Sequence, residues 1–245
     1  MGDKPTIALI LLVFNEIDGL KAIVPAIDQS LFNEIILVDG GSSDGSTEFA
    51  RKAGLRVIQQ RKPGLSEAVL EAVSAATSEY LIEFSPDGNC KADDLPNLVA
   101  KIREGYDLVV VSRYLPPAVS YDDTAITHFG NWMFTKMIGM LGSPVVTDAL
   151  TIYRGFRREI PISPSFKRLL VGPVFEPLVT AWVLGNGRSY AEIPGDEPRR
   201  IGGERKMRVI YNGSCIIYMV VRMYLLKLTR RIFMLKPRRL PPSSH

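Results

Sequence analysis

The chain has 245 residues, of which 46% are hydrophobic, and its formal net charge is +4. This length and composition suit one substantial core with room for an appended element. The two cysteines, Cys90 and Cys215, lie far apart and make no disulfide framework, and the two histidines argue against a His-rich zinc site or a Ser-His-Asp triad.

The first half of the chain alternates between apolar runs and segments with helical spacing. The run 7–14 is continuously apolar and ends at Asn15, which is typical of a buried parallel strand. The same pattern repeats four times. Strands are expected at 7–14, 55–60, 80–84 and 106–114, and a further strand is expected to begin at residue 34. Helices are expected at 19–29, 47–53, 66–76 and 93–103.

Strands separated by helices indicate a parallel sheet with right-handed crossovers, and ligands of such sheets bind beyond the carboxyl ends of the strands. The unusual residues of this half all fall at those ends: Asn15 and Glu16, 39–46, 61–64, 85–89, and Arg113. Each alone reads as a turn or a helix cap. Together, at one edge of one sheet, they favour a shared site.

Glycine spacing excludes two common nucleotide sites. The segment 38–46, VDGGSSDGS, has no G-x-G-x-x-G and no Gly-Lys-Ser/Thr ending, which argues against a dinucleotide fingerprint and a P-loop. Asp39 directly follows a strand, and its carboxylate suits the N–H and O–H donors of a base or a ribose.

Eight features in order resemble the family 2 glycosyltransferases of the GT-A fold. The resemblance is closest to the branch that moves a sugar onto a polyprenyl or dolichyl phosphate, and it covers residues 5 to 210. The features are VFNE (13–16), ILVDGGSSDGS (36–46), KPGLSEAV (62–69), FSPDGN (84–89), SRY (112–114), TDALTIYRGFRRE (147–159), Glu176 and RRIGGERK (199–206).

The resemblance implies an α/β fold with a Rossmann-like, mostly parallel sheet flanked by helices. It implies a catalytic domain over residues 1–210, with a nucleotide-sugar-binding half (1–115) and an acceptor-binding half (116–210). The donor is expected to be a UDP- or GDP-sugar. The residues expected to bind it are Val13, Phe14 and Glu16 at the nucleoside, Asp39 at the base, and Gly64, Ser85 and Pro86 nearby.

The turn Ser85–Asn89 matches the D-x-D-x-Q/N motif of the family. Asp87 corresponds to its second acid and Asn89 to the amide, so both are expected to ligate Mg²⁺ or Mn²⁺ bridging the diphosphate. Ser85 departs from the pattern, because the first acid is missing. The same five residues also suit an ordinary turn, with Pro86 fixing φ.

Three cations match family positions that neutralise phosphate, namely Arg113, Arg200 and Lys206, and 199–206 is expected to be a mobile loop. A lipid phosphate acceptor is already anionic and needs no strong base, which predicts inversion at the anomeric carbon. A glycan hydroxyl would need a base, for which Asp148 is the candidate; otherwise Asp148 is a cap or an arginine partner. A non-catalytic nucleotide-sugar or membrane-binding module is the remaining alternative.

The C-terminal segment 211–245 is expected to form a basic amphipathic helix and tail. One face is apolar: Ile217, Val221, Tyr224, Leu225, Leu228, Ile232 and Leu235. Arg222, Lys227, Arg230 and Arg231 lie on the other half. Such a helix can lie at a membrane surface or pack on the core or a second subunit.

The chain shows no segment with the pattern of a transmembrane helix, since the run 209–221 holds Asn212, Gly213 and Ser214 and stops at Arg222. We therefore expect a cytoplasmic protein, peripheral on the cytoplasmic face of a membrane. No nucleic-acid partner is expected, because the basic tail carries no recognised nucleic-acid module.

Overall fold

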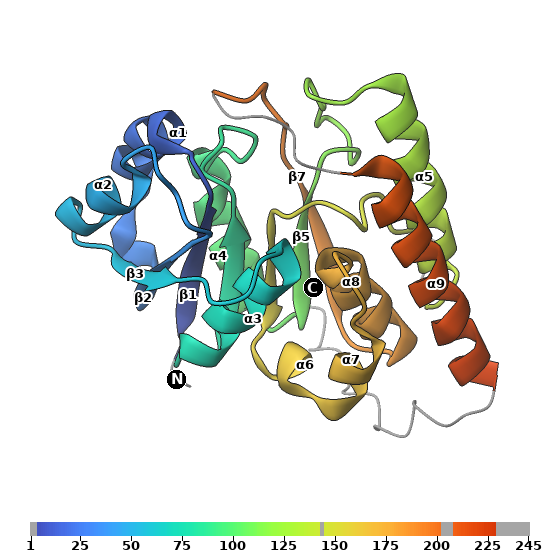
Figure 1. Cartoon of the computed structure of the whole chain (residues 1–245). Coiled ribbons are helices and arrows are strands. Elements are labelled where there is room, and N and C mark those ends of the chain that lie inside the picture. Colours follow the sequence, from blue (N-terminus) through green and yellow to red (C-terminus); the bar gives the residue numbers. More distant parts are fainter. Residues whose placement is uncertain (1–3, 143–144, 202–207, 229–245) are drawn as a thin grey trace.

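Seven strands form one sheet in the part of the chain that the structure, a computed structural model, describes: residues 4–142, 145–201 and 208–228 (Figure 1). The sheet order is β3-β2-β1-β4-β6-β5-β7. The strands are β1 (Ile7–Val13), β2 (Glu34–Asp39), β3 (Arg56–Gln59), β4 (Tyr80–Phe84), β5 (Leu108–Ser112), β6 (Arg154–Arg157) and β7 (Tyr190–Pro194).

The expected GT-A-like, mostly parallel sheet is confirmed. β1 pairs in parallel with β2 and β4, and β5 pairs in parallel with β7. β6 runs antiparallel between β4 and β5, and the sequence analysis did not predict it. The segment RGFR is short and rich in arginine, so it lacks the apolar run that marked the other central strands.

Helices cover both faces of this sheet, as expected. The helices are α1 (Ile17–Ile23), α2 (Ser46–Lys52), α3 (Leu65–Ala75), α4 (Leu95–Arg103), α5 (Ala125–Gly139), α6 (Glu159–Ile162), α7 (Pro164–Leu169), α8 (Phe175–Gly185) and α9 (Val209–Leu228). Buried side chains of α1, α2 and α4 form one core with alternate residues of β1, and those of α3 and α5 to α9 form the second. Continuous apolar strands are therefore covered on both sides.

The expected helix 19–29 is broken into three pieces. α1 ends at Ile23, and short 3-10 turns follow at Val24–Ala26 and Gln29–Leu31. Pro25 explains the break, because it has no N–H to continue the α-helical hydrogen bonds and it disfavours an α conformation at the preceding residue.

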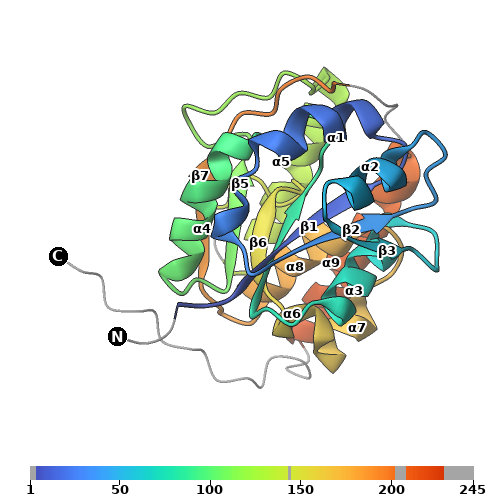
Figure 2. The same cartoon turned by 90° about the vertical axis from the view of Figure 1, so that its left-hand side faces the viewer.

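α9 packs against α5, α7 and α8, on the side of the molecule away from α1 and α2 (Figures 1 and 2). The residues that it buries are Ile216, Met219, Val220 and Met223. Tyr224 Oη donates to the Met137 carbonyl at 2.9 Å, and Lys227 Nζ donates to the Leu141 carbonyl at 2.6 Å. The helix is therefore attached to the core from Ile216 to Lys227.

Most of the apolar face expected for this segment does not pack on the core, although one expected member, Tyr224, is half-buried and does. Ile217, Val221, Leu225 and Leu228 are all exposed. α9 thus has two apolar faces, one buried and one open, and only Arg222 and Lys227 are basic within its bounds. The other expected members, Ile232, Leu235, Arg230 and Arg231, lie outside the described residues.

The sequence led us to expect no helix with the pattern of a membrane span, and for this segment that prediction is wrong. Among the described residues, Val209–Leu228 is one helix that is long and apolar enough to cross a membrane by length and composition, with 22% of its apolar window buried. Asn212, Gly213 and Ser214 lie within its first two turns without ending it, because the buried contacts to α5 and α8 hold the helix together.

Candidate functional site

The turns that follow β1 and β2 are tied to each other by side-chain hydrogen bonds. Asn15 has a left-handed backbone, with φ of 57°. Its amide N–H donates to Ser42 Oγ, and its side-chain oxygen accepts from the Ser43 N–H, both at 2.8 Å. The Glu16 N–H donates to Ser46 Oγ at 3.1 Å. Two predicted nucleotide-binding turns therefore form one unit at the carboxyl edge of the sheet.

Asp39, the last residue of β2, is buried beneath this unit. Its carboxylate accepts from the backbone N–H groups of Gly41 and Ser42 at 3.2 Å. Burial raises the pKa of Asp39, but the hydrogen bonds from Ser42 outweigh it, and the net shift is downward. Asp39 stays ionised and orders the turn next to Phe14, whose ring is 42% exposed beside Gly40.

The other predicted donor residues lie at the same edge. Val13 ends β1 and pairs with Asp39. Gly64 precedes α3 with φ of 112°, a conformation that favours glycine, and its carbonyl accepts from Gln60 Nε2 at 2.8 Å. The predicted residues of the nucleotide half thus surround one end of the sheet.

The turn Ser85–Asn89 follows β4 directly and packs against α1. A Cβ atom on Gly19 would lie 2.0 Å from the Pro86 carbonyl oxygen, so only glycine allows this approach. Asp87 is 5% exposed. One of its oxygens accepts from the Asn89 N–H at 3.0 Å, and the other lies 3.3 Å from Arg200 Nη1.

The residues of this turn fit a hard divalent cation in their chemistry. Asp87 offers a carboxylate, and the buried Oδ1 of Asn89 accepts no hydrogen bond from any described residue. Hard cations bind such oxygens. Within the described ranges, no group of three or more His, Cys, Asp or Glu side chains is already arranged to hold a metal. Metal binding at this turn therefore requires side chains to move.

Arg113, which follows β5, is held by two carboxylates. Its Nε lies 2.7 Å and its Nη2 3.1 Å from the two oxygens of Asp148, and its Nη1 lies 3.2 Å from Glu197 Oε1. Burial raises the pKa of Asp148, but the charge and hydrogen bonds of Arg113 outweigh it and leave the pKa below its ordinary value. Asp148 is thus an ionised arginine partner, with both oxygens engaged.

The loop after Arg113 pairs with the segment after β7. Ser120 and Glu197 form a parallel bridge. The Glu197 N–H donates to the Val119 carbonyl at 3.0 Å, and the Ile201 N–H donates to the Asp87 carbonyl at 2.8 Å. This pairing brings Arg200 to the SPDGN turn. Lys206, the third predicted cation, lies outside the described residues, as does most of the expected loop 199–206.

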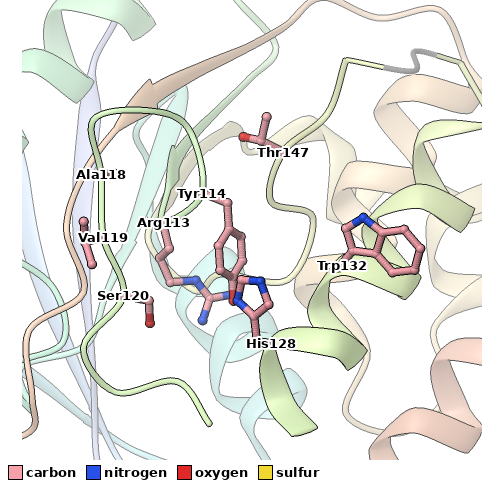
Figure 3. A pocket seen from close by; sticks show the side chains of 8 residues that line it. All are labelled: Arg113, Tyr114, Ala118, Val119, Ser120, His128, Trp132 and Thr147. Carbon is pink, nitrogen blue, oxygen red and sulfur yellow. The ribbon is translucent and has the colours of Figure 1, made fainter. Parts of the chain in front are cut away.

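A cavity of about 450 Å³ opens beside Arg113. It is lined by Arg113, Tyr114, Ala118, Val119, Ser120, His128, Trp132 and Thr147. Figure 3 shows Arg113, Tyr114 and His128 together on one side, with Trp132 at the other. Trp132 is 54% exposed and stacks near Phe129, with ring centroids 5.9 Å apart. The cavity therefore has a polar end, where Arg113 is paired with Asp148 and Glu197, and an apolar mouth at Trp132.

Sequence reasoning missed four residues of this region: Asp122, Glu197, His128 and Trp132. His128 lines the cavity and stacks edge-on to Tyr114. The loop residues come from segments with no strand or helix periodicity. The acidic pair in SYDDT, directly after a strand and its SRY turn, was the one available signal for Asp122.

Comparisons with known proteins agree with this fold. The family model described as Glycosyl transferase family 2 matches residues 8–161. A dolichyl-phosphate hexose transferase of Haloferax volcanii is 27% identical over 89% of this chain and 94% of its own length. The glycosyltransferase AglJ of the same organism is 28% identical over 65% of this chain, which spans 52% of AglJ.

A dolichol-phosphate mannosyltransferase of Pyrococcus furiosus is 25% identical over 82% of this chain and 59% of its own length. Among solved structures, glucosyl-3-phosphoglycerate synthase of Mycobacterium tuberculosis, in complex with Mn²⁺, UDP and glucosyl-3-phosphoglycerate, is similar with a TM-score of 0.63 and 20% identity. The match covers 98% of this chain and 82% of that one. At this identity the likeness shows a shared fold.

Proposed function

The chain belongs to glycosyl transferase family 2, and from that premise we propose that it transfers a hexose from a UDP- or GDP-sugar to a polyprenyl or dolichyl phosphate, with inversion at the anomeric carbon. The names of the Haloferax and Pyrococcus relatives support a lipid phosphate acceptor. The proposal also depends on the chemistry of the residues at the donor and acceptor ends of the site.

The donor is proposed to bind at the carboxyl edge, where the turns of β1, β2 and β4 meet. Phe14 offers an exposed ring for a base, and Asp39 and Glu16 lie beside it. Asp87 and Asn89 would hold Mg²⁺ or Mn²⁺, and the Mn²⁺ in the mycobacterial complex supports that assignment. The cation would neutralise the diphosphate as it leaves. Arg200, next to Asp87, supports the same charge.

The observation that carries the proposal is the two-ended cavity beside Arg113. Its polar end presents Arg113, His128 and Ser120. Arg113 binds Asp148 and Glu197, and the Ser120 hydroxyl donates to Glu197, so a phosphate at this end would take donors that Glu197 now uses. Its mouth presents the exposed ring of Trp132. A phosphate attached to an isoprenoid chain matches both ends, whereas a glycan hydroxyl would leave the apolar mouth in water.

The state of Asp148 supports the same acceptor. A hydroxyl nucleophile needs a base, but the carboxylate of Asp148 is fully buried and binds Arg113 with both oxygens, and its pKa lies below its ordinary value. Such a carboxylate is a weak base. A phosphate monoester attacks without a base, so the role proposed for Asp148 is to position Arg113 at the phosphate.

The open face of α9 is proposed to hold the protein at a membrane that contains the acceptor. Ile210, Ile217, Val221, Leu225 and Leu228 are all exposed on it. An apolar face of this size on a soluble surface marks an interaction site. α5, which carries Trp132 at the mouth of the cavity, packs directly on α9.

The test is a panel of radiolabelled UDP- and GDP-sugars, incubated with the protein, Mn²⁺ or Mg²⁺ and a short polyprenyl phosphate, with label counted in the organic phase. Transfer that EDTA abolishes, and that the matching polyprenol without phosphate does not support, is the expected result. Trp132→Ala should raise KM for the lipid phosphate about tenfold without changing nucleotide binding. Met140→Ala, an equally exposed apolar residue near α5, is the matched control.

Nucleotide binding or hydrolysis without transfer to any lipid phosphate would contradict the proposed acceptor. Transfer to an oligosaccharide would then assign the chain to glycan elongation. Binding without turnover would assign it to a nucleotide-sugar-binding module.

A further inference from the structure

The turn Ser85–Asn89 carries one carboxylate where the family pattern has two. A second carboxylate reaches this turn from elsewhere: Asp122, in the loop between β5 and α5. Asp122 Oδ2 accepts a hydrogen bond from Asn89 Nδ2 at 3.1 Å, from 33 residues along the chain. Asp122 keeps 22% of its side chain exposed, so solvent and ions have access to it.

Arg200 contacts both of these carboxylates. Its Nη1 lies 3.3 Å from Asp87 Oδ2, and its Nε lies 3.6 Å from Asp122 Oδ2. Both distances are longer than a good charge-assisted hydrogen bond. The guanidinium is therefore a loosely held cation between two carboxylates. A divalent metal at the same place would compensate more of their negative charge.

The network around this turn has an excess of negative charge among the described residues. Its members are connected through ion pairs and through Asn89. They are the carboxylates of Asp87, Asp122, Asp148 and Glu197 and the guanidinium groups of Arg113 and Arg200. Four negative groups against two positive groups leave two negative charges, which is the charge that one divalent cation balances.

Asn89 supplies an independent sign of a ligand. Its Nδ2 is used by Asp122 and by Glu197, at 3.1 and 3.4 Å, whereas its buried Oδ1 accepts no hydrogen bond from the described residues. A buried amide oxygen without a partner is costly, and a cation or its water would satisfy it.

We infer that Asp122 supplies the carboxylate missing at Ser85, so that the metal of the donor is held by Asp87 and Asn89 from one loop and by Asp122 from another. The inference rests on the proposed metal-dependent transfer and deepens it. Arg200, which here contacts both carboxylates, is then available for the diphosphate. It also explains how the acceptor-side loop is coupled to donor binding, since the same loop lines the cavity through Val119 and Ser120.

The test is a titration of Mn²⁺, with free Mn²⁺ followed by electron paramagnetic resonance, in the presence of UDP or GDP. Asp122→Asn keeps the shape of the side chain but removes its charge, and we expect Mn²⁺ affinity to fall at least about tenfold. Asp93→Asn, the same change at an exposed carboxylate, is the matched control and should bind Mn²⁺ like the unaltered protein. Thermal unfolding of each variant verifies its fold, and Asp122→Ser replaces Asp122→Asn if the latter does not fold.

A rescue variant makes the inference specific to the missing acid. Ser85→Asp combined with Asp122→Asn restores two carboxylates at the turn, so Mn²⁺ affinity should recover to within about threefold of the unaltered protein. Unchanged Mn²⁺ affinity in Asp122→Asn, or loss without rescue, would overturn the inference.

The proposed function and the role of Asp122 can be contradicted independently of each other. If the unaltered protein transfers sugar to lipid phosphate while Asp122→Asn binds Mn²⁺ normally, only the role of Asp122 is wrong. If the unaltered protein binds no Mn²⁺ with either nucleotide, the role of Asp122 is wrong, and the transfer assay with EDTA decides whether a metal-free transferase remains.

Discussion

The two halves of the site are held together by different means. On the nucleotide side, the turns after β1 and β2 are fastened by short polar side chains to backbone N–H groups, as in the pairs Asn15–Ser42 and Glu16–Ser46. On the acceptor side, Arg113 is fixed by Glu197, 84 residues away, and Asn89 contacts the same glutamate across 108 residues. The first arrangement is a set of hydrogen bonds within and between turns, one carboxylate, that of Asp39, among the acceptors, and the second is a network of ion pairs from four segments.

This difference has a consequence for stability and function. Each hydrogen bond between turns contributes about 1 kcal/mol to the free energy of unfolding, and one can be lost without the others. A network of buried charges is satisfied as a whole, so removing one member leaves its partner charged and unpaired. We therefore expect substitutions on the acceptor side to unfold the protein more readily than those on the nucleotide side.

The largest expected effect is that of Asp148→Asn. This change leaves the guanidinium of Arg113, which is 11% exposed, with only Glu197 as a carboxylate partner. Breaking a buried pair in this way costs about 3 to 5 kcal/mol of unfolding free energy, measured by urea denaturation. Glu104→Gln, at the exposed pair with Lys101, should change it by no more than about 0.5 kcal/mol. Equal effects at the two pairs would remove the contrast between the halves.

Asp87→Ala is expected to act on catalysis. It removes the carboxylate that both the proposed metal and Arg200 use. The value of kcat/KM for the donor should fall about 10² to 10³-fold, with metal-dependent nucleotide binding lost, as judged by calorimetry. Asp93→Ala is the control at an exposed acid of the same half. Normal binding of donor and metal by Asp87→Ala would contradict the assignment of the turn.

Gly19→Ala tests how the nucleotide half positions the SPDGN turn. The added Cβ would meet the Pro86 carbonyl at 2.0 Å, so α1 and the turn must separate. We expect a loss of about 1 to 3 kcal/mol in stability and weaker nucleotide binding. Gly130→Ala, in α5 with no atom within 4 Å of the new Cβ, should be neutral or stabilising by up to about 1 kcal/mol. If the Gly19→Ala protein were as stable as the Gly130→Ala protein, the contact of residue 19 with Pro86 would be able to rearrange without loss of stability.

The smallest effect on folding is expected at the open face of α9. Ile217→Ser, Val221→Ser and Leu225→Ser together remove exposed apolar surface, so each should change stability by about 0.5 kcal/mol or less. Binding to liposomes, measured by sedimentation, should fall at least about tenfold. Val220→Ala, on the buried face, should lower stability but keep liposome binding. Unchanged sedimentation of the triple variant would mean that this face does not contact the membrane.

The fold and the nucleotide half could be read closely from the sequence. Continuous apolar runs placed β1, β2, β4 and β5 within two residues of their observed bounds. The order of the motifs also led to the family and to the carboxyl edge of the sheet. These features are local, because a buried strand and the turn that follows it are written in consecutive residues.

The predictions were weakest where structure depends on distant partners. β6 is a strand because its backbone completes the hydrogen bonding of β4 and β5, and the short arginine-rich segment RGFR gives no sign of that. For α9, the sequence predicted one apolar face; four of its members, Ile217, Val221, Leu225 and Leu228, are exposed, and the buried face of Ile216, Met219, Val220 and Met223 was not predicted. Which face packs on the core is decided by α5, α7 and α8, not by the helix itself.

The sequence by itself determined the parallel strands β1 to β5 and the family, because hydrophobic periodicity and ordered turn motifs are properties of contiguous residues. Only the tertiary structure decided that Asp148 is the partner of Arg113, that Trp132 and His128 line one cavity, and that Asp122 meets Asn89. The contacts of Asp148 and Asp122 join segments 33 or more residues apart. Their free energy comes from charges and surfaces that meet only after the chain has folded.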